Sequence, residues 1–585
     1  MPLLRSLFVF FIFCSLACNT TTTNQKDVRD NHLSFAVFQE NFLDSFWKHN
    51  PAYAIYAGYG KYYDRLKIPD STSLLQDLLF ARKWIDSLNQ YNYESLNAGD
   101  KINYQIIRNR LQSNIWYIDT FKAWQWNPAQ YNIGSECFGL ISDVDVPLNQ
   151  RLVTLSSHLQ NSDAYYAAAA KNIERPTKEH TELAIHQNKG TLQIFGAGLM
   201  DSIKSATLAA VEKDTLLHRV DRTKAAINNY ISFLDKKITV SATSFRDFRI
   251  GKEMYQAKFH YDLVTDITPE NLYAKAIEAK NYYHKQMFRL ANELWPEYAG
   301  GIKKPNDSLQ LIKTIIDKVS LRHVSPQNLM DTIRNQVARL QGFIIQKNLF
   351  NYDTSYPLKV RTTPAYASGF SVASANFPPP YKKTSVAYYN IDDLTKIPAE
   401  KAESQLREHN DYMLQILSIH EAMPGHCLQG VYNSKNQSGI VKSVFQNGAM
   451  IEGWAVYVER MMLENGWGNN EPELWLMFYK WSLRECCNVI VDYGLHCLNF
   501  SKDDIINLLV NEAFQEPAQV EEKYRRARLS QVQLCSYFNG ATDIRALRDA
   551  YKKKQGKNFS LKDFHERFLS YGSAPVKYIS ELMLQ

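Results

Sequence analysis

Helical periodicity is the feature that most restricts the fold of this chain. From about residue 31 to residue 296, long segments place apolar residues at positions i, i+3, i+4 and i+7, which lie on one face of an α-helix. Four such segments are 75–88, 104–118, 225–234 and 272–294. The alternation that is typical of strands is rare. We therefore expect a mostly α fold, a large helical body with a cleft and few short strands.

Local signals refine this prediction. Helix starts are indicated by Thr268-Pro269, by Ser325-Pro326 and by Ser560. Residues 356–390 differ, because proline clusters and the run Val-Ala-Tyr-Tyr at 386–389 indicate loops and one or two short strands. We expect one two-lobed body, with an N-terminal helical region at 31–255 and a C-terminal metallopeptidase-like region at 256–585.

Composition excludes several classes of protein. The 585 residues are 45% hydrophobic and 22% charged, which excludes a chain that is disordered throughout. Lys and Arg number 67 against 60 Asp and Glu, and no basic block reaches five residues. The net charge of +7 therefore gives no electrostatic argument for nucleic acid as a partner.

The first residues indicate export. A single positive charge at Arg5 precedes an apolar run, and the small residue Ala17 precedes Cys18. This pattern is typical of a secretory signal peptide at 1–17, followed by a polar tether at 18–30. The ending resembles a bacterial lipobox, so we expect lipidation at Cys18, a lipid anchor as the only contact with a membrane, and a location in the periplasm or at the outer membrane or surface. Plain secretion is the alternative.

The remaining cysteines do not form a disulfide framework. They are scattered, two of them are adjacent, and no Cys-x-x-Cys pair occurs. A thiolate zinc site is therefore not expected, and most of these side chains should be buried as small apolar groups.

The chemistry is concentrated in residues 420–426, which read His-Glu-Ala-Met-Pro-Gly-His. A Glu directly after a His on a helix is the way many zinc peptidases place a general base beside the metal. The usual second His stands at i+4, whereas here His426 stands at i+6, about 120° away on a straight helix. Pro424 and Gly425 must bend or end the helix, which could return His426 toward His420. Spacing alone neither establishes nor excludes a metal site.

Glu452 is a third candidate ligand. It lies in an apolar stretch, where a carboxylate is costly unless it is paired, protonated or bound to a cation. Two histidines and one Glu would leave a tetrahedral position open for water, as in catalytic zinc sites. Glu459, at i+7 on the same helix face, could support this site or form a salt bridge. A helix cap or an ion pair is the alternative interpretation of Glu452.

The sequence resembles a bacterial family, domain of unknown function 885, which is placed with thermolysin-like zinc peptidases of the His-His-Glu type. The family pattern His-Glu-Ala-x-Pro-Gly-His-His-Leu-Gln corresponds to residues 420–429, Glu-Gly-Trp-Ala-x-Tyr to 452–457, and Val-Asp-x-Gly-x-His to 491–496. Further matches occur at 533–540 and near the C-terminus. The order of several motifs makes the resemblance specific.

The resemblance implies a mostly helical zinc hydrolase that acts on peptides. It implies that His420, His426 and Glu452 bind Zn²⁺ and that Glu421 is the catalytic base. Two departures stand out: Cys427 replaces the second His of the family pattern, which makes it an alternative ligand to His426, and residues 531–532 are Gln-Val where the family has Pro-Gly.

Other candidate residues complete this hypothesis, each with an ordinary structural alternative. Tyr537 and His496 are candidate donors to the oxyanion, and Asp492 could orient His496 or a metal-bound imidazole. Arg526 could bind a substrate carboxylate, and Tyr389 could line the cleft.

The sequence is compatible with two functions that belong to different classes. The first is a zinc-dependent hydrolase of short peptides outside the cytoplasm, since a deep helical cleft would exclude folded proteins. The second is a non-catalytic surface lipoprotein that binds peptides or envelope material. The presence of Glu421 favours the first, because a binding protein needs no general base.

Overall fold

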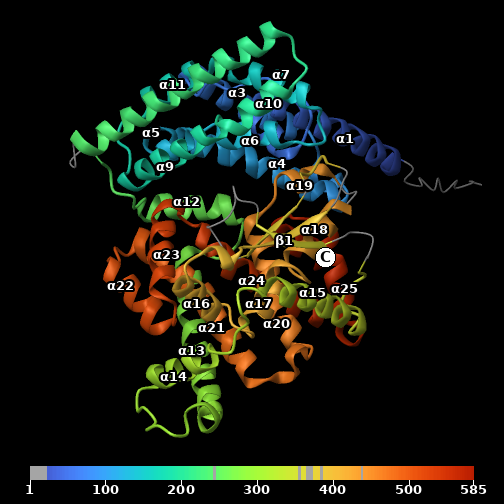
Figure 1. Cartoon of the computed structure of the whole chain (residues 1–585). Helices are drawn as coiled ribbons and strands as arrows, with labels where there is room; N and C mark the ends of the chain where they lie inside the picture. The colour runs from blue at the N-terminus through green and yellow to red at the C-terminus, as the bar shows by residue number, and fades with distance from the viewer. Residues whose placement is uncertain are drawn as a thin grey trace, which may run out of the picture.

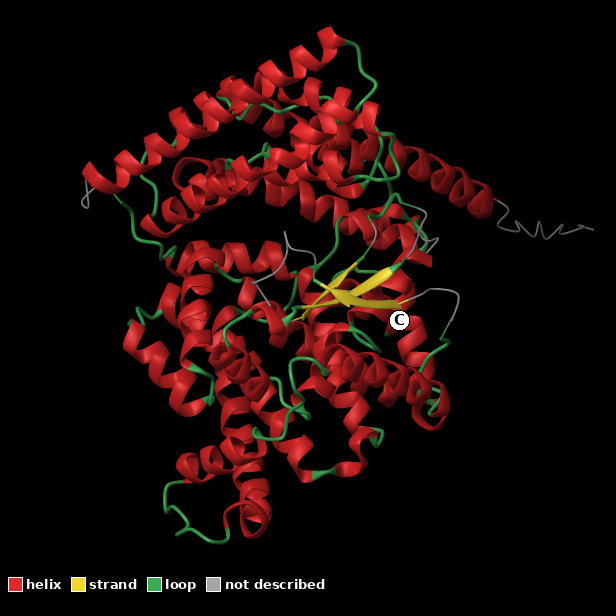
Figure 2. Ribbon diagram, viewed as in Figure 1, coloured by secondary structure: helices red, strands yellow, loops and turns green. Residues whose placement is uncertain are grey.

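A computed structural model describes residues 23–240, 245–352, 358–363, 373–377, 379–382, 386–435 and 439–585 (Figures 1 and 2). Most of these residues are helical, which confirms the mostly α fold. The predicted signal peptide and Cys18 lie outside the described residues. Helix α1 begins at Thr23, so residues 23–30 of the predicted tether are helical.

The N-terminal helices form the upper part of the molecule in Figure 1. They are α1 Thr23–His49, α2 Pro51–Ala57, α3 Ser71–Leu88, α4 Ala98–Trp116, α5 Ala123–Trp126, α6 Gly134–Ser142, α7 Leu148–His158, α8 Ser162–Asn172, α9 Lys178–Ile194, α10 Ala197–Ser205 and α11 Ala210–Val240.

The later helices form the body below them in the same view. They are α12 Gly251–Leu263, α13 Pro269–Ala299, α14 Ser308–Val319, α15 Leu329–Gln346, α16 Ala399–Glu408, α17 Met413–Glu421, α18 His426–Lys435, α19 Ile440–Val444, α20 Gly448–Glu464, α21 Pro472–Cys497, α22 Lys502–Ile506, α23 Pro517–Ser530, α24 Ser536–Gln555, α25 Leu561–Ser570 and α26 Val576–Met583. Among the described helices, none is long and apolar enough to cross a bilayer.

Two of the three predicted helix starts are confirmed. The hydroxyl of Thr268 accepts the backbone N–H of Asn271 at the start of α13, and Ser560 caps α25 in the same way. Ser325-Pro326 is wrong as a helix start, because the chain first closes a turn in which the N–H of Asn328 donates to the carbonyl of Ser325. Helix α15 begins only at Leu329.

A small sheet interrupts the helices. Its strands are β1 Leu358–Thr362, β2 Ala373–Asn376 and β3 Ala387–Ile391, in the order β1-β3-β2. β1 pairs with β3 in parallel and β2 pairs with β3 antiparallel, so that Ala375 lies opposite Tyr389. The sequence predicts one or two short strands here, whereas the part of the chain that the structure describes has three. β2 lies at an edge of this sheet, which leaves one side of its backbone without a strand partner among the described residues.

Two apolar cores stabilise the fold. The smaller core is built from side chains between residues 131 and 234, in the middle of the N-terminal half. The larger core joins the body to α1, α3 and α4, and Phe46 packs against Phe445 with ring centroids 5.0 Å apart. The first helices thus belong to the same core as the elements that carry the candidate site.

Helices α20 and α24 touch through their backbones. A Cβ atom on Gly453 would lie 2.4 Å from Cα of Gly540, and one on Gly540 would lie 1.8 Å from the carbonyl oxygen of Ala449. Neither position can hold a side chain at this separation. The contact sets the spacing between the helix that carries Glu452 and the helix whose first turn carries Tyr537.

Candidate metal centre

The turn between α17 and α18 brings the two histidines together. The N–H of Gly425 donates to the carbonyl of Ile419, and a Cβ at Gly425 would lie 1.8 Å from the carbonyl oxygen of His420. Only glycine allows so close a return of the chain. The indole N–H of Trp454 donates to the carbonyl of Pro424 at 3.0 Å and fixes the turn. The ring centroids of His420 and His426 are consequently 4.8 Å apart.

Glu452 of α20 completes a cluster with these rings. Its Oε2 lies 3.4 Å from Nε2 of His426 and 3.8 Å from Nε2 of His420. Burial would raise the pKa of Glu452, but hydrogen bonds and charge from the two imidazoles outweigh burial and hold this pKa well below its ordinary value. The carboxylate is therefore ionised and points at both rings.

The donor set fits a zinc ion. One ligand atom from each of the three residues lies within 4.8 Å of the others. Ligands about 2.0–2.1 Å from a tetrahedral zinc are about 3.3 Å apart, close to the two separations above. Two nitrogens and one carboxylate oxygen are also the ligand types of catalytic zinc sites. This geometry agrees with the predicted ligands.

A buried carboxylate orients His420. Nδ1 of His420 lies 2.7 Å from Oε1 of Glu459, which also accepts the indole N–H of Trp481 at 3.0 Å. This contact engages Nδ1, so Nε2 is the ring nitrogen that remains on the side of Glu452 for a metal ion. The contact predicted for Glu459 is thus present. Nδ1 of His426 has no partner in the part of the chain that the structure describes, so the two rings are held differently.

Glu421 ends α17 beside this cluster. Burial raises the pKa of its carboxyl group, the charges of His426 and His420 act in the opposite direction, and the charge of Glu452 raises it further. The backbone of Ala375 in β2 donates a hydrogen bond that lowers this pKa. Glu421 is half-buried and lies between the three candidate ligands and the edge strand.

Tyr537 and Arg526 flank the cluster on another side. Nη2 of Arg526 donates to the hydroxyl of Tyr537 at 3.2 Å and to Oε1 of Gln533 at 2.7 Å. Burial raises the pKa of Tyr537, and the nearby charge of Glu452 raises it further. The hydroxyl is therefore protonated at neutral pH, as a hydrogen-bond donor must be.

Two of the other predicted residues, His496 and Asp492, lie elsewhere. His496 is buried, with Nε2 3.0 Å from the carbonyl of Ala527, so the structure does not bring it to the three candidate ligands. Asp492 accepts the hydroxyl of Tyr255 at 2.6 Å and the backbone N–H of Val532 at 2.6 Å, so it holds a turn rather than an imidazole. That N–H belongs to a valine with φ of +69°, at the position where the family pattern has glycine.

Tyr389 does not line an open surface. Its side chain is fully buried, with the hydroxyl 3.5 Å from Oγ of Ser418, so its predicted contact with substrate is wrong. Cys427 is also fully buried, and burial raises the pKa of its thiol well above the ordinary value. His426 rather than Cys427 therefore faces Glu452.

Trp481 and Glu485 were not found from the sequence. Both lie on α21, and Glu485 carries a pKa raised well above its ordinary value by burial and by the charge of Glu459. No motif or local spacing marks either residue, because their contacts depend on the packing of α21 against α20.

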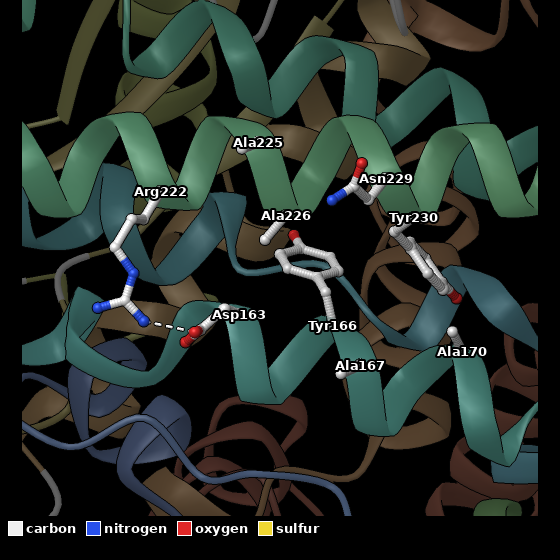
Figure 3. Close-up of a pocket in the computed structure, with 9 residues that line it drawn as sticks. All are labelled: Asp163, Tyr166, Ala167, Ala170, Arg222, Ala225, Ala226, Asn229 and Tyr230. Atoms are coloured by element: carbon white, nitrogen blue, oxygen red, sulfur yellow. Dashed lines mark hydrogen bonds and ion pairs between the residues drawn. The ribbon is translucent and has the colours of Figure 1, made fainter.

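A separate cavity of about 340 Å³ lies between α8 and α11 (Figure 3). Alanine and tyrosine side chains line most of it, and the ion pair of Arg222 with Asp163 closes one end. The close-up shows these residues on N-terminal helices, and none of the three candidate ligands is among the residues that line the cavity. This cavity contributes nothing to the metal centre.

The arrangement of motifs on this fold can be compared with known proteins. The sequence profile of a family described as "Bacterial protein of unknown function (DUF885)" matches residues 51–583. The chain belongs to the DUF885 family. This confirms the resemblance inferred from the motifs. No curated protein matches this DUF885 sequence.

Two solved structures are similar to this DUF885 protein. A candidate lipoprotein of unknown function from Shewanella oneidensis is 43% identical, with a TM-score of 0.88 over 94% of this chain and 100% of that one. A candidate lipoprotein from Colwellia psychrerythraea is 16% identical, with a TM-score of 0.76 over 94% of this chain and 98% of that one. The second likeness is evidence for the fold alone.

Proposed function

We propose that this DUF885 protein is a zinc-dependent hydrolase of peptide bonds that acts on short peptides outside the cytoplasm. The observation that carries the proposal is the convergence of Nε2 of His420, Nε2 of His426 and Oε2 of Glu452, with Glu421 beside them. A site for binding alone would need no carboxylate base next to the ligands.

The roles of the residues follow from their chemistry. His420, His426 and Glu452 would hold the zinc ion, which when bound supplies a Lewis acid for a carbonyl oxygen and lowers the pKa of water. Glu421 accepts a proton from the attacking water, whose oxygen forms the new bond to the acyl carbon. The C–N bond breaks, and Glu421 returns the proton to the leaving amine. The hydroxyl of Tyr537 donates to the carbonyl oxygen as negative charge develops on it.

The edge strand supports a peptide as the substrate class. The backbone of Ala375 in β2 is hydrogen-bonded to Glu421, and β2 has a strand partner on one side only among the described residues. An extended peptide can add to such an edge through main-chain hydrogen bonds. This would place one of its peptide bonds beside Glu421.

We also propose a cell-envelope location through a lipid on Cys18. The N-terminal sequence has the features of an export signal that ends at this cysteine, and the 43% identical protein from Shewanella oneidensis is a candidate lipoprotein. A secreted form without lipid is the alternative.

The test combines metal analysis with hydrolysis of a peptide library by the chain without residues 1–18. We expect stoichiometric zinc, and loss of hydrolysis after treatment with a chelator. Glu421→Gln should keep the zinc and lose about 10²–10⁴-fold in rate, because it removes the base and not a ligand. Zinc without turnover in the unaltered chain would contradict catalysis and favour a binding protein. The absence of both would contradict the whole assignment.

A further inference from the structure

A group of three basic side chains lies between α21 and α23, next to the proposed zinc site. Its centre is Lys523, whose side chain is 7% exposed and whose Nζ has no hydrogen-bond partner among the described residues. Arg484 on α21 and Arg526 on α23 are the other two. None of the three forms an ion pair with a carboxylate that the structure describes. A buried amine without a hydrogen-bond partner is costly, which makes Lys523 a candidate for binding a ligand.

The surroundings of Lys523 increase the excess of positive charge. Burial and the charge of Arg484 lower the pKa of Lys523 well below its ordinary value, and Arg526 contributes in the same direction, while Cys487 and Glu408 act in the opposite direction. Glu408 is already bonded to Lys480 at 2.6 Å, so its charge is neutralised. The amine of Lys523 therefore lacks the counter-charge that would stabilise it as an ammonium ion.

Two contacts connect these cations with the proposed zinc site. The guanidinium of Arg484 lies over the ring of Trp481 at 5.3 Å, and Trp481 donates to Glu459, the carboxylate that orients His420. Arg526 donates to the hydroxyl of Tyr537, whose pKa responds to the charge of Glu452. Arg484 is thus separated from His420 by Trp481 and Glu459, and Tyr537 lies between Arg526 and the charge of Glu452.

A ligand can approach these side chains from solvent at one of the three residues. Arg526 stands one helical turn after Lys523 and is exposed, whereas Arg484 is half-buried. The hydrogen bond from Arg484 to Gln519, at 3.2 Å, uses only one of the five N–H groups that a guanidinium carries. A small anion could enter past Arg526 and meet further donors from Arg484 and Lys523.

We propose that Arg484, Lys523 and Arg526 bind the carboxylate at the free C-terminus of the peptide substrate, so that the enzyme releases residues from C-terminal ends. This inference rests on the proposed zinc-dependent peptide hydrolysis and names its substrate class. A carboxylate satisfies the unpartnered donors and neutralises the excess charge. Its fixed position relative to Glu421 would select a peptide bond near the end of the chain.

The test uses three peptides of one sequence: a free acid, its C-terminal amide, and an amide with Asp as its last residue. We expect the free acid to be hydrolysed with a kcat/KM about 100-fold above that of the plain amide, the size expected of charge-assisted hydrogen bonds. Equal kcat/KM for acid and amide overturns the inference and leaves the hydrolase proposal standing. Recovery by the Asp amide alone would identify a side-chain carboxylate as the ligand and overturn C-terminal selection.

Substitutions test whether these basic residues cause the preference for the free acid over the amide. In Lys523→Met and in Arg526→Gln the ratio of acid to amide should fall about tenfold or more, mainly through KM of the acid. The matched controls, Arg525→Gln on the exposed face of the same helix and Lys553→Met on α24, should keep the ratio of the unaltered chain. Arg526 is exposed, so its variant tests the inference even if Lys523→Met fails to fold. A ratio that survives in both variants overturns the assignment.

A binding measurement separates this inference from the hydrolase proposal. Calorimetry of the zinc-loaded chain should show tighter binding of the free acid than of the amide, and Arg526→Gln should reduce that difference. If no peptide is hydrolysed but this difference is present, hydrolysis is refuted and the carboxylate site stands. If the acid and amide bind equally, the carboxylate site is refuted.

Discussion

His420 and His496 are both buried in this DUF885 protein and both have a carboxylate as a neighbour, yet their environments differ. His420 is bonded through Nδ1 to Glu459, and its Nε2 faces Glu452. Nε2 of His496 is bonded to the carbonyl of Ala527, and the neighbouring Asp492 is taken by Tyr255 and by a backbone N–H. Burial lowers the pKa of both rings, but only at His420 do carboxylates reverse the effect and raise it well above the ordinary value.

The difference shows what distinguishes a candidate ligand from a structural histidine. Burial and a nearby carboxylate occur at both residues. At His420, Nε2 faces another candidate metal ligand while Nδ1 is hydrogen-bonded to a carboxylate. Only His420 of the two rings has this combination. His496 instead uses a ring nitrogen to satisfy a helix carbonyl, which stabilises the fold.

The largest effect should come from removing a ligand. His426→Ala should lose stoichiometric zinc, because two donors cannot replace three. His496→Ala should keep its zinc and lose about 1–3 kcal/mol of unfolding free energy, because the buried carbonyl of Ala527 loses its donor. Elemental analysis and chemical denaturation measure the two quantities. Loss of zinc in His496→Ala would contradict the assignment of His496 as a structural residue rather than one of the metal site.

A smaller effect should follow from the carboxylates. Glu459→Gln should weaken zinc binding by about 10–100-fold, because the amide orients His420 less firmly and makes it less basic. Asp492→Asn should leave zinc affinity unchanged and reduce stability, because Asp492 holds Tyr255 and the turn at Val532. Competition with a fluorescent chelator gives both affinities. Equal affinities in the two variants would contradict the role assigned to Glu459.

The smallest effect concerns pH and a third buried histidine, His565. It lies between the hydroxyl of Tyr457, at 2.9 Å, and the carbonyl of Leu349, at 3.2 Å, and burial lowers its pKa to about 3. Between pH 6.5 and 3 the unfolded chain binds a proton that the folded chain does not, so stability falls as pH falls, by about 1.4 kcal/mol per pH unit.

His565→Gln should remove this part of the slope, measured by denaturation between pH 7 and pH 5. His218→Gln, which replaces an exposed ring, should keep the slope of the unaltered chain. An unchanged slope in His565→Gln would show that His565 does not belong to the same structural class as His496.

The sequence predicts features that depend on neighbouring residues. The helix at 71–88 follows from apolar periodicity, and the helix at 269–299 follows from apolar periodicity and the capping residue Thr268. Pro424 and Gly425 require the helix to bend or end, which permits the return of His426 to His420 without establishing it, and Glu452 is conspicuous as a carboxylate in an apolar helix. In each case the physical cause lies within a few residues of the feature.

Features that depend on distant elements were missed or misjudged. The parallel pairing of β1 with β3 joins segments separated by the intervening β2. Asp492 stands four residues before His496, as an orienting carboxylate would, but Tyr255 from another helix takes its oxygen. The lack of a hydrogen-bond partner at Lys523 likewise depends on which faces of α21 and α23 pack together. The spacing of residues within α23 does not predict it.

The two facing glycines of α20 and α24 have a consequence for the width of the proposed zinc site. No hydrogen bond joins Glu452 to Tyr537 among the described residues, so the distance between this candidate ligand and the phenol depends on the close approach of the helices at two glycines. A methyl group at Gly453 or Gly540 would act as a wedge and move the two helices apart. Such a variant would keep its ion yet hold the phenol too far away to reach a substrate.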